Sequence, residues 1–289
     1  MRSVRSIGPR TQICAVIGNP VAHSLSPTIH NAAFEERDLD FVYVAHRVDD
    51  LKNALAGMRA LENFRGMSIT IPHKIEAMKY VDEVVEVDRH IGSINTVINE
   101  QGRLIGLGTD GPGAVKAMVT AGVDVNDKQL LILGAGGAAR AISFTVIGQA
   151  KLEKLTILDI DVMLLQQLTA DLKAATDAIV TSEVLTDNSL GVAMKHADVI
   201  IHCTPVGMHP KQDVSLIPVD FYRSGQVIFD IVYTPLETKL LAEAKSSGLK
   251  VISGVDMFIN QAALQFEQFT GTDAPVEIMR KVVMEQLAL

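Results

Sequence analysis

The feature that most constrains the fold is a regular alternation of apolar strands and helices that begins near residue 127. The expected strands lie within residues 129–137, 154–161, 177–185, 195–205, 225–235 and 250–254. The expected helices lie within residues 139–150, 162–175 and 238–248. Strands that are apolar along most of their length and alternate with helices are typical of a parallel sheet covered on both faces. We therefore expect an α/β region here.

The first half of the chain is also α/β, but it is less regular. The expected strands cover residues 11–18, 40–48, 65–71 and 94–108, and the last of these contains a hairpin at Glu100–Gly102. The expected helices cover 27–38 and 51–61. A further helical segment runs from residue 257 to the C-terminus. Because it follows the regular sheet, we expect it to pack elsewhere.

Composition excludes some classes of function. The chain has 289 residues, 48% of them hydrophobic, which suits two domains with ample core. Only 4% are aromatic, and the 26 basic and 34 acidic residues give a net charge of −8. Without a Lys/Arg run, we expect no nucleic acid partner. An anionic small substrate remains compatible with this charge, because one local cation can outweigh a distant average.

Cysteine usage and the termini indicate the compartment. Cys14 and Cys203 lie in apolar runs without a CxxC partner, so we expect reduced core thiols and a cytoplasmic protein. Residues 1–10 are expected to form a loose tail and not a signal peptide, since only a short apolar run follows them. No run approaches the roughly 20 apolar residues of a membrane span. We therefore expect no membrane association.

A glycine turn follows the first strand of the regular region. Gly134 permits a tight turn, Gly136 allows close approach of a pyrophosphate to a helix N-terminus, and Ala139 fills the third small position. Glycine turns also end ordinary strands, but the strand–turn–helix context favours dinucleotide binding. Asp159, about 20 residues further on, suits an adenosine ribose and would repel a 2′-phosphate. We predict NAD, with NADP possible; the alternative is that Asp159 merely caps the next helix.

An alternating strand ends in a lysine. In the stretch GMSITIPHK, we expect Met67, Ile69 and Ile71 to face one way, and Ser68, Thr70 and Lys74 the other. A lysine can act in acid–base chemistry because its ammonium stabilises a developing alkoxide. The residues alone leave open whether Lys74 is a solvated loop charge.

Eight motifs together resemble one family, the shikimate dehydrogenases with their NAD-using shikimate/quinate relatives. In chain order they are GNPVAHSLSPTIHN, GMSITIPHK, IGSINTV, GLGTDGPG, GAGGAARA, CTPVGM, DIVYTPLET and GVDMFINQAA. The resemblance implies a substrate domain of residues 1–109 and 254–289, closed by C-terminal helices, and a Rossmann domain of residues 110–253. It also implies reversible reduction of 3-dehydroshikimate to shikimate with a nicotinamide cofactor.

Site residues follow from the same resemblance. Catalysis is assigned to Lys74 and Asp110. The implied substrate residues are Ser24, Ser26, Thr70, Asn95, Asp110, Tyr233 and Gln261. The implied cofactor residues are Gly134, Ala135, Gly136, Gly137, Ala138, Asp159, Thr204, Ile231, Gly254 and Met257. Without the family, several have ordinary alternatives: Ser26 as a helix start, Asn95 as a turn stabiliser, Gln261 as an exposed helical residue, Met257 as core and Asp110 as a helix cap.

Histidines do not change this assignment. His23, His30 and His73 come from separated segments without a metal-binding motif, so we expect no metal site.

Two departures from the family pattern concern substrate preference. Ser68 and Gly108 stand where the family often has Asn. Quinate or aminoshikimate dehydrogenase activity, or a non-catalytic metabolite sensor, are the alternatives. Ser26 favours shikimate over quinate, while Lys74 and Asp110 argue against the sensor. The substrate is expected to be a small molecule and the protein a monomer or homodimer.

Overall fold

A computed structural model describes residues 7–288 of the chain. The loose tail expected over residues 1–10 falls mostly on residues 1–6, which lie outside the described residues, as does Leu289. The described chain divides into two compact units, which we call unit 1 (residues up to 109, with 261–287) and unit 2 (residues 110–260). The division falls within one long helix, α9 (Gly254–Thr270). The predicted boundary at residue 253 stays a prediction.

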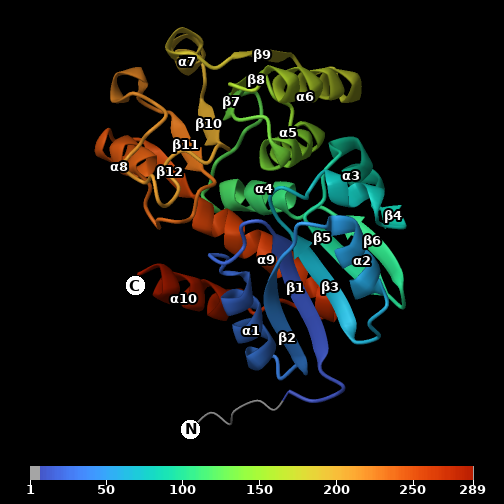
Figure 1. The fold of residues 1–289 in the computed structure, drawn as a ribbon. Coiled ribbons are helices and arrows are strands. Elements are labelled where there is room, and N and C mark those ends of the chain that lie inside the picture. Colours follow the sequence, from blue (N-terminus) through green and yellow to red (C-terminus); the bar gives the residue numbers. More distant parts are fainter. Residues whose placement is uncertain (1–6, 289) are drawn as a thin grey trace. The chain divides into compact units, whose positions relative to one another are not determined.

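Unit 1 contains a mixed six-stranded sheet in the order β2-β1-β3-β5-β6-β4 (Figure 1). Its strands are β1 (Gln12–Gly18), β2 (Phe41–Arg47), β3 (Phe64–Ile69), β4 (Glu83–Val84), β5 (Thr96–Glu100) and β6 (Arg103–Leu107). β1 runs parallel to β2 and β3, whereas β5 is antiparallel to both β3 and β6. The mixed sheet explains why this half of the sequence is less regular, since long helices join the parallel strands β1, β2 and β3, whereas a hairpin joins β5 to β6.

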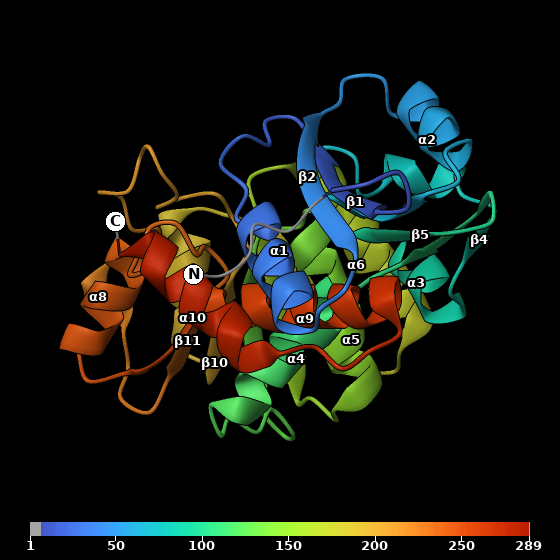
Figure 2. The same ribbon diagram turned by 90° about the horizontal axis from the view of Figure 1, so that it is seen from below.

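Helices complete unit 1. They are α1 (Ser26–Glu36), α2 (Leu51–Arg59), the short 3₁₀ helix η1 (Glu76–Lys79), α3 (Glu86–Ile91), the unit 1 part of α9, and α10 (Val276–Leu287). α10 lies against α1, although the two are far apart in sequence (Figures 1 and 2). The prediction that the C-terminal segment is helical is confirmed. The short α3 was not predicted, because its six residues carry no clear helical period.

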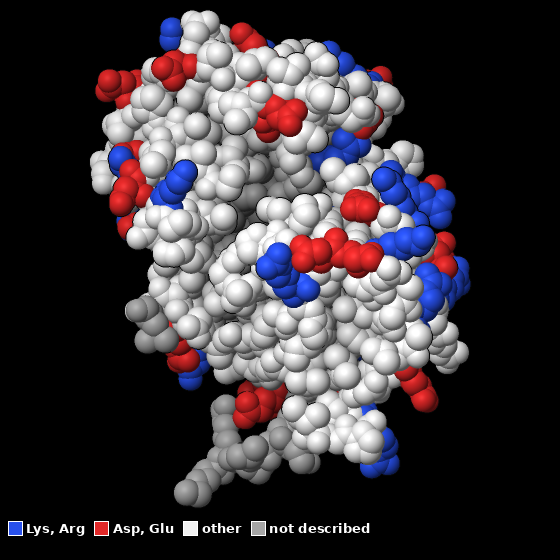
Figure 3. Space-filling view, in the orientation of Figure 1, with Lys and Arg blue, Asp and Glu red and all other residues white. Residues whose placement is uncertain are grey.

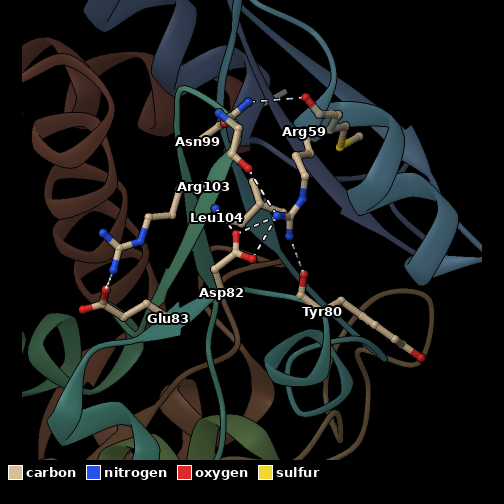
Figure 4. Close-up of polar contacts among 9 residues, drawn as sticks. Arg59, Tyr80, Asp82, Glu83, Asn99, Arg103 and Leu104 are labelled. Carbon is tan, nitrogen blue, oxygen red and sulfur yellow. Dashed lines mark hydrogen bonds and ion pairs between the residues drawn. The ribbon is translucent and has the colours of Figure 1, made fainter.

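The hairpin predicted at Glu100–Gly102 joins β5 to β6. Gln101 and Gly102 both have positive φ, as a two-residue hairpin turn requires. A polar clamp holds this turn: the Arg59 guanidinium donates to Asp82 Oδ2 at 2.7 Å and to the Gly102 carbonyl at 3.2 Å (Figure 4). Asp82 also accepts from the Leu104 amide at 2.7 Å. The clamp therefore fixes the outer strands of the sheet to α2.

Unit 2 contains an all-parallel six-stranded sheet in the order β12-β11-β10-β7-β8-β9. Its strands are β7 (Gln129–Leu133), β8 (Lys154–Asp159), β9 (Val180–Val184), β10 (Val199–His202), β11 (Val227–Asp230) and β12 (Lys250–Ser253). All six predicted strands are confirmed. The order of the strands reverses between β7 and β10, which is where open parallel sheets bind ligands.

Helices cover the sheet of unit 2. They are α4 (Asp110–Thr120), α5 (Gly137–Gln149), α6 (Val162–Ala175), α7 (Asp187–Met194), α8 (Lys239–Ser246), the 3₁₀ helix η2 (Val219–Phe221) and the unit 2 part of α9. α5 and α6 lie on one face of the sheet and α8 on the other, as right-handed crossovers from a reversed strand order require (Figure 1). α4 and α7 were not predicted. The glycines of α4 hid its helical pattern: a Cβ on Gly111 would lie 2.0 Å from Thr145 Oγ1 of α5.

Surface charge is mixed. On the face drawn in Figure 3, acidic and basic side chains are interspersed, in keeping with a net charge of only −8. On that face, a charged ligand meets individual groups and not a broad field of one sign. Among the described residues, none of the helices has the length and apolar character needed to cross a bilayer.

Candidate functional site

Lys74 lies in the turn after β3. The strand ends at Ile69, and the chain turns through a cis Ile71–Pro72 peptide. Lys74 is half-buried, and its carbonyl accepts from the Ile94 amide at 3.0 Å. The prediction that Ile71 shares the buried face of Met67 and Ile69 is wrong: Ile71 is 66% exposed, because the strand has already ended. The fixed turn delivers Lys74 from the end of a buried strand.

Two serine hydroxyls lie together where α1 begins. Ser24 Oγ donates to Ser26 Oγ at 3.2 Å and accepts from the Ser26 amide at 3.3 Å. Ser26 is the first residue of α1 and Pro27 the second, so the alternative that Ser26 starts a helix is also correct. One loop thus presents two neighbouring hydroxyls in unit 1.

Asn95 and Gln261 are brought together through Thr109. Asn95 Nδ2 donates to Thr109 Oγ1 at 2.9 Å, and Asn95 Oδ1 accepts from the Thr109 amide at 2.8 Å. Gln261 Oε1 lies 3.4 Å from both Asn95 Nδ2 and Thr109 Oγ1. The alternative that Gln261 is an ordinary exposed residue is wrong, since it is only 9% exposed. Thr109 lies within the motif GLGTDGPG but was not predicted as a site residue, because its partners Asn95 and Gln261 are distant in the chain.

A second polar chain lies next to this cluster. The Tyr43 hydroxyl donates to Ser68 Oγ at 2.6 Å, and Ser68 Oγ donates to Gln265 Oε1 at 2.8 Å. Gln265 Nε2 in turn donates to Thr96 Oγ1 at 2.9 Å. Ser68 is therefore buried within a side-chain network, in which its hydroxyl accepts from the phenol of Tyr43.

Gly108, the other departure from the family pattern, also has a local reason. Its amide donates to Asp88 Oδ2 at 2.9 Å, and a Cβ at this position would lie 2.6 Å from Asp88 Oδ1. A longer side chain at position 108 would displace this buried carboxylate. The predicted contact of Thr70 with substrate stays a prediction; its methyl group packs against Gly18.

The glycine turn of unit 2 fits a bound phosphate group. Gly134 has φ of 112°, and a Cβ there would lie 2.9 Å from the Cys203 carbonyl oxygen, so a glycine is required. Gly136 precedes α5, and no side chain caps this helix N-terminus. A Cβ on Gly136 would meet no atom within 4 Å. The backbone is therefore open to a ligand where the first amides of α5 begin, the arrangement that binds pyrophosphate. Ala135, Gly137 and Ala138 complete this turn.

Asp159 ends β8 beside the glycine turn. Its carboxylate accepts from the Ala135 amide and, at 2.7 Å, from the Asp161 amide. The alternative that Asp159 caps α6 is wrong, because Asp161 is the cap and accepts from the Met163 and Leu164 amides. A carboxylate can accept further bonds, so Asp159 is still able to bind a ribose hydroxyl.

The remaining predicted cofactor residues gather at the carboxyl ends of β10 and β11. Thr204 follows β10, and Ile231 follows β11. Gly254 is packed against Ile231: a Cβ on Gly254 would lie 2.5 Å from the Ile231 carbonyl carbon and oxygen. Met257, one turn further along α9, is buried, so its alternative role as a core residue agrees with its position. The structure thus brings Ile231 and Gly254 together at one edge of the sheet.

Tyr233 and Asp110 belong to unit 2, whereas Lys74 and the other predicted substrate residues belong to unit 1. Tyr233 stacks on Phe258 with ring centroids 4.5 Å apart, and burial raises the pKa of its phenol to about 12. The phenol is therefore neutral and can donate a hydrogen bond at neutral pH. Asp110 is buried at the start of α4. The predicted partnership of Lys74 with Asp110 stays a prediction.

Sequence reasoning missed a buried pair in unit 2. His202 Nδ1 lies 2.9 Å from Asp230 Oδ1, and both side chains are almost fully buried. Burial, together with the charges of Asp230 and Asp110, raises the pKa of the adjacent Cys203 thiol. The available signal was two polar residues, one near the end of each of two apolar strands. Among residues 7–288, no group of His, Cys, Asp and Glu has the arrangement of a metal site.

Comparison with known proteins identifies similarity to shikimate dehydrogenases along most of the chain. Residues 16–97 match the family described as Shikimate dehydrogenase substrate binding domain, and residues 254–284 match Shikimate 5'-dehydrogenase C-terminal domain. A protein of Moorella thermoacetica named Shikimate dehydrogenase (NADP(+)) is 40% identical over 279 residues, covering 96% of this chain and 94% of that protein.

Solved structures of shikimate dehydrogenases are also similar to this chain. The crystal structure of a shikimate dehydrogenase in complex with NADP+ has a TM-score of 0.90 at 36% identity, covering 98% of each chain. The shikimate 5-dehydrogenase of Listeria monocytogenes, in complex with shikimate and NAD, has a TM-score of 0.89 at 32% identity, covering 97% of this chain and 99% of that one.

Proposed function

The chain belongs to the shikimate dehydrogenase family, and on that premise we propose that it catalyses the reversible reduction of 3-dehydroshikimate to shikimate. One observation carries the proposal: a single chain combines a lysine held on a fixed turn, buried polar side chains able to bind a polyol, and an open glycine turn able to bind a dinucleotide.

Lys74 is the proposed proton donor and acceptor. The nicotinamide cofactor supplies the hydride when it is bound. Reduction of the ketone places negative charge on the substrate oxygen, and the Lys74 ammonium stabilises this charge and delivers the proton. Asp110 is the proposed partner that orients the lysine. The fixed turn around Lys74 favours the acid–base role of this lysine, since an acid–base group must lie within about 3 Å of the reacting oxygen.

Polar side chains of unit 1 account for substrate recognition. Ser24 and Ser26 are the proposed donors to the substrate carboxylate, with the Tyr233 phenol of unit 2 as a further donor. Thr70, Asn95 and Gln261 are the proposed contacts to the ring hydroxyls. Because Asn95 and Gln261 are buried, an analogue that lacks a ring hydroxyl loses its hydrogen bond to them and is rejected.

We further propose a preference for NAD over NADP. Asp159 and Asp161 place two carboxylates at the end of β8, and Ile160 between them is 76% exposed. The five residues after Asp159 include neither Lys nor Arg, so this segment offers a 2′-phosphate repulsion and no cationic partner. The Moorella thermoacetica relative is named for NADP(+), so a comparison of the two cofactors on this chain tests the proposed preference directly.

The cofactor experiment compares kcat/KM for NAD and NADP. We expect the wild type to favour NAD, and the double variant Asp159→Asn/Ile160→Arg to shift the ratio of the two kcat/KM values towards NADP by about tenfold or more, or about 1.4 kcal/mol. Asp177→Asn is a control that removes a carboxylate elsewhere in unit 2. A wild type that prefers NADP overturns the proposed preference but leaves the reaction intact.

The reaction is tested by turnover of shikimate and of quinate with each cofactor. We expect shikimate to be oxidised faster. Faster turnover of quinate would make the chain a quinate dehydrogenase, and shikimate binding without turnover would make it a metabolite sensor. The proposal includes a cytoplasmic location, which the free Cys14 and Cys203 thiols support, and a monomer or homodimer.

A further inference from the structure

His202 and Asp230 occupy facing positions on neighbouring strands. β10 and β11 are parallel, and His202 at the end of β10 is in register with Asp230 at the end of β11. Every other residue of these two strands is Val, Ile or Phe. A buried polar pair in such surroundings is costly unless its groups are hydrogen-bonded. The pair therefore calls for an account of every donor and acceptor.

Asp230 accepts hydrogen bonds at both oxygens. Oδ1 accepts from the Val232 amide at 3.0 Å and lies 2.9 Å from His202 Nδ1, while Oδ2 accepts from Thr238 Oγ1 at 2.6 Å. The Val232 amide and the Thr238 hydroxyl both donate to Asp230, and a carboxylate accepts hydrogen bonds and cannot donate them. His202 Nδ1 must therefore carry a hydrogen. In the neutral ring this leaves Nε2 as an acceptor.

The acceptor nitrogen meets Thr204. His202 Nε2 lies 2.5 Å from Thr204 Oγ1, and the same oxygen accepts from the Val206 amide at 3.2 Å. A threonine hydroxyl has one hydrogen and two lone pairs. The hydrogen is used by His202 and one lone pair by Val206. One lone pair remains on a half-buried side chain at the carboxyl end of β10.

We propose that His202 is a positioning residue, which orients the Thr204 hydroxyl so that its remaining lone pair accepts from an N–H or O–H donor of the bound nicotinamide cofactor. The inference rests on the proposed function, because Thr204 is a proposed cofactor residue. If the pair only joined two strands, loss of the Nε2 acceptor would leave cofactor affinity unchanged. The two roles therefore differ in a measurable quantity.

The test uses His202→Asn, Thr204→Val and their combination in the full chain. An Asn amide can still donate to Asp230 but is too short to accept from Thr204, so the buried carboxylate keeps a partner. We expect each single variant to raise the Kd for NAD by about three- to tenfold in titration calorimetry, the effect of one hydrogen bond. The double variant should bind as Thr204→Val does, because the same contact is lost.

A second readout needs no cofactor. Long-range ¹H–¹⁵N spectra at pH 7.5 should show the His202 ring protonated at Nδ1 and not at Nε2, and the missing resonance in His202→Asn assigns it. A ring protonated at Nε2, an unchanged Kd in either single variant, or additive effects in the double variant overturns the inference.

If His202→Asn fails to fold, the tautomer of the wild type and the Kd of Thr204→Val decide, since an Nε2-protonated ring or an unchanged Kd overturns the inference. A wild type that binds neither NAD nor NADP overturns the proposed function together with this inference. A wild type that binds NAD, with variants that bind equally well, overturns this inference alone.

Discussion

Units 1 and 2 build their candidate sites from different materials. In unit 1 the candidate site consists largely of neutral side chains that hydrogen-bond one another, such as Asn95, Thr109 and Gln261. In unit 2 it consists mainly of backbone, with Gly134, Gly136 and Gly254 where a side chain would collide or would fill open space.

The difference follows from what each unit is proposed to bind. A small polyol needs several directed donors and acceptors, which side chains supply. A pyrophosphate needs close approach to backbone amides, which glycine allows. We therefore expect the two sites to respond differently to mutation: the first through lost functional groups, the second through added atoms.

The largest expected effect is in unit 1. Lys74→Ala should lower kcat by about a hundredfold or more, because it removes the positioned acid–base group. The Kd for the cofactor, measured by titration, should be unchanged. Lys79→Ala, which removes an exposed lysine five residues further on, is the matched control and should retain activity. Near-normal turnover of Lys74→Ala would remove this residue from the mechanism.

Two glycines of unit 2 should separate folding from binding. Gly134→Ala forces a Cβ into a left-handed residue 2.9 Å from a carbonyl oxygen, and should cost about 1–3 kcal/mol of unfolding free energy. Gly136→Ala has room for its Cβ in the free protein, so stability should be unchanged while the Kd for NAD rises by about tenfold or more.

Urea unfolding and titration calorimetry measure these two quantities on the same samples. Equal effects of the two substitutions on stability would contradict the distinction between a turn that must be glycine and a turn that is open for a ligand.

The core behind the site of unit 1 predicts a pH effect of intermediate size. His30 is fully buried and stacks on Tyr43 at 4.4 Å, and burial lowers its pKa from 6.5 to about 3. The unfolded chain therefore takes up a proton below pH 6.5 that the folded chain refuses, so stability is lost as the pH falls. Between pH 7.5 and pH 5 this loss is about 2 kcal/mol.

His30→Phe keeps an aromatic ring against Tyr43 and removes the titrating group. Urea unfolding at both pH values should show a smaller loss of stability in the variant than in the wild type, by about 2 kcal/mol. The same pH dependence in both proteins would contradict this account, because it would show that burial of His30 does not cause the loss of stability at low pH.

The smallest expected effects concern the polar clamp of unit 1. Asp82→Asn weakens contacts to Arg59 and Leu104, and should cost about 1 kcal/mol in urea unfolding. Glu83→Gln, which affects only the exposed pair with Arg103, should change stability by less than about 0.5 kcal/mol. A larger effect for Glu83→Gln than for Asp82→Asn would contradict this order.

Local pattern was sufficient for most of the fold. The six strands of unit 2 were predicted because each is a short apolar run between turn residues, and the hairpin because Glu100–Gly102 interrupts a long expected strand. The helices α4 and α7 were missed, since glycine in α4 serves packing against α5, and α7 begins with Asp187, Asn188 and Ser189, which are typical of turns.

The candidate site was predictable only where a motif carries its own geometry. The glycine turn, the serine loop and the lysine at the end of β3 could each be named from a few consecutive residues. Thr109, Gln265 and Asp230 could not, because their partners are distant in the chain. Thr109 is 14 residues from its partner Asn95, Gln265 is 170 residues from Asn95, and Asp230 is 28 residues from His202.

Short stretches of the sequence were enough to predict the α/β class, the parallel sheet, the glycine turn and the identity of the chemical groups, because these depend on composition and short-range periodicity. The folded chain was needed to establish that Ile71 faces solvent, that Ser68 is held between Tyr43 and Gln265, and that His202 faces Asp230. Those outcomes depend on where strands end and on which strands are neighbours. Such long-range packing is set by the whole chain and not by any short stretch of it.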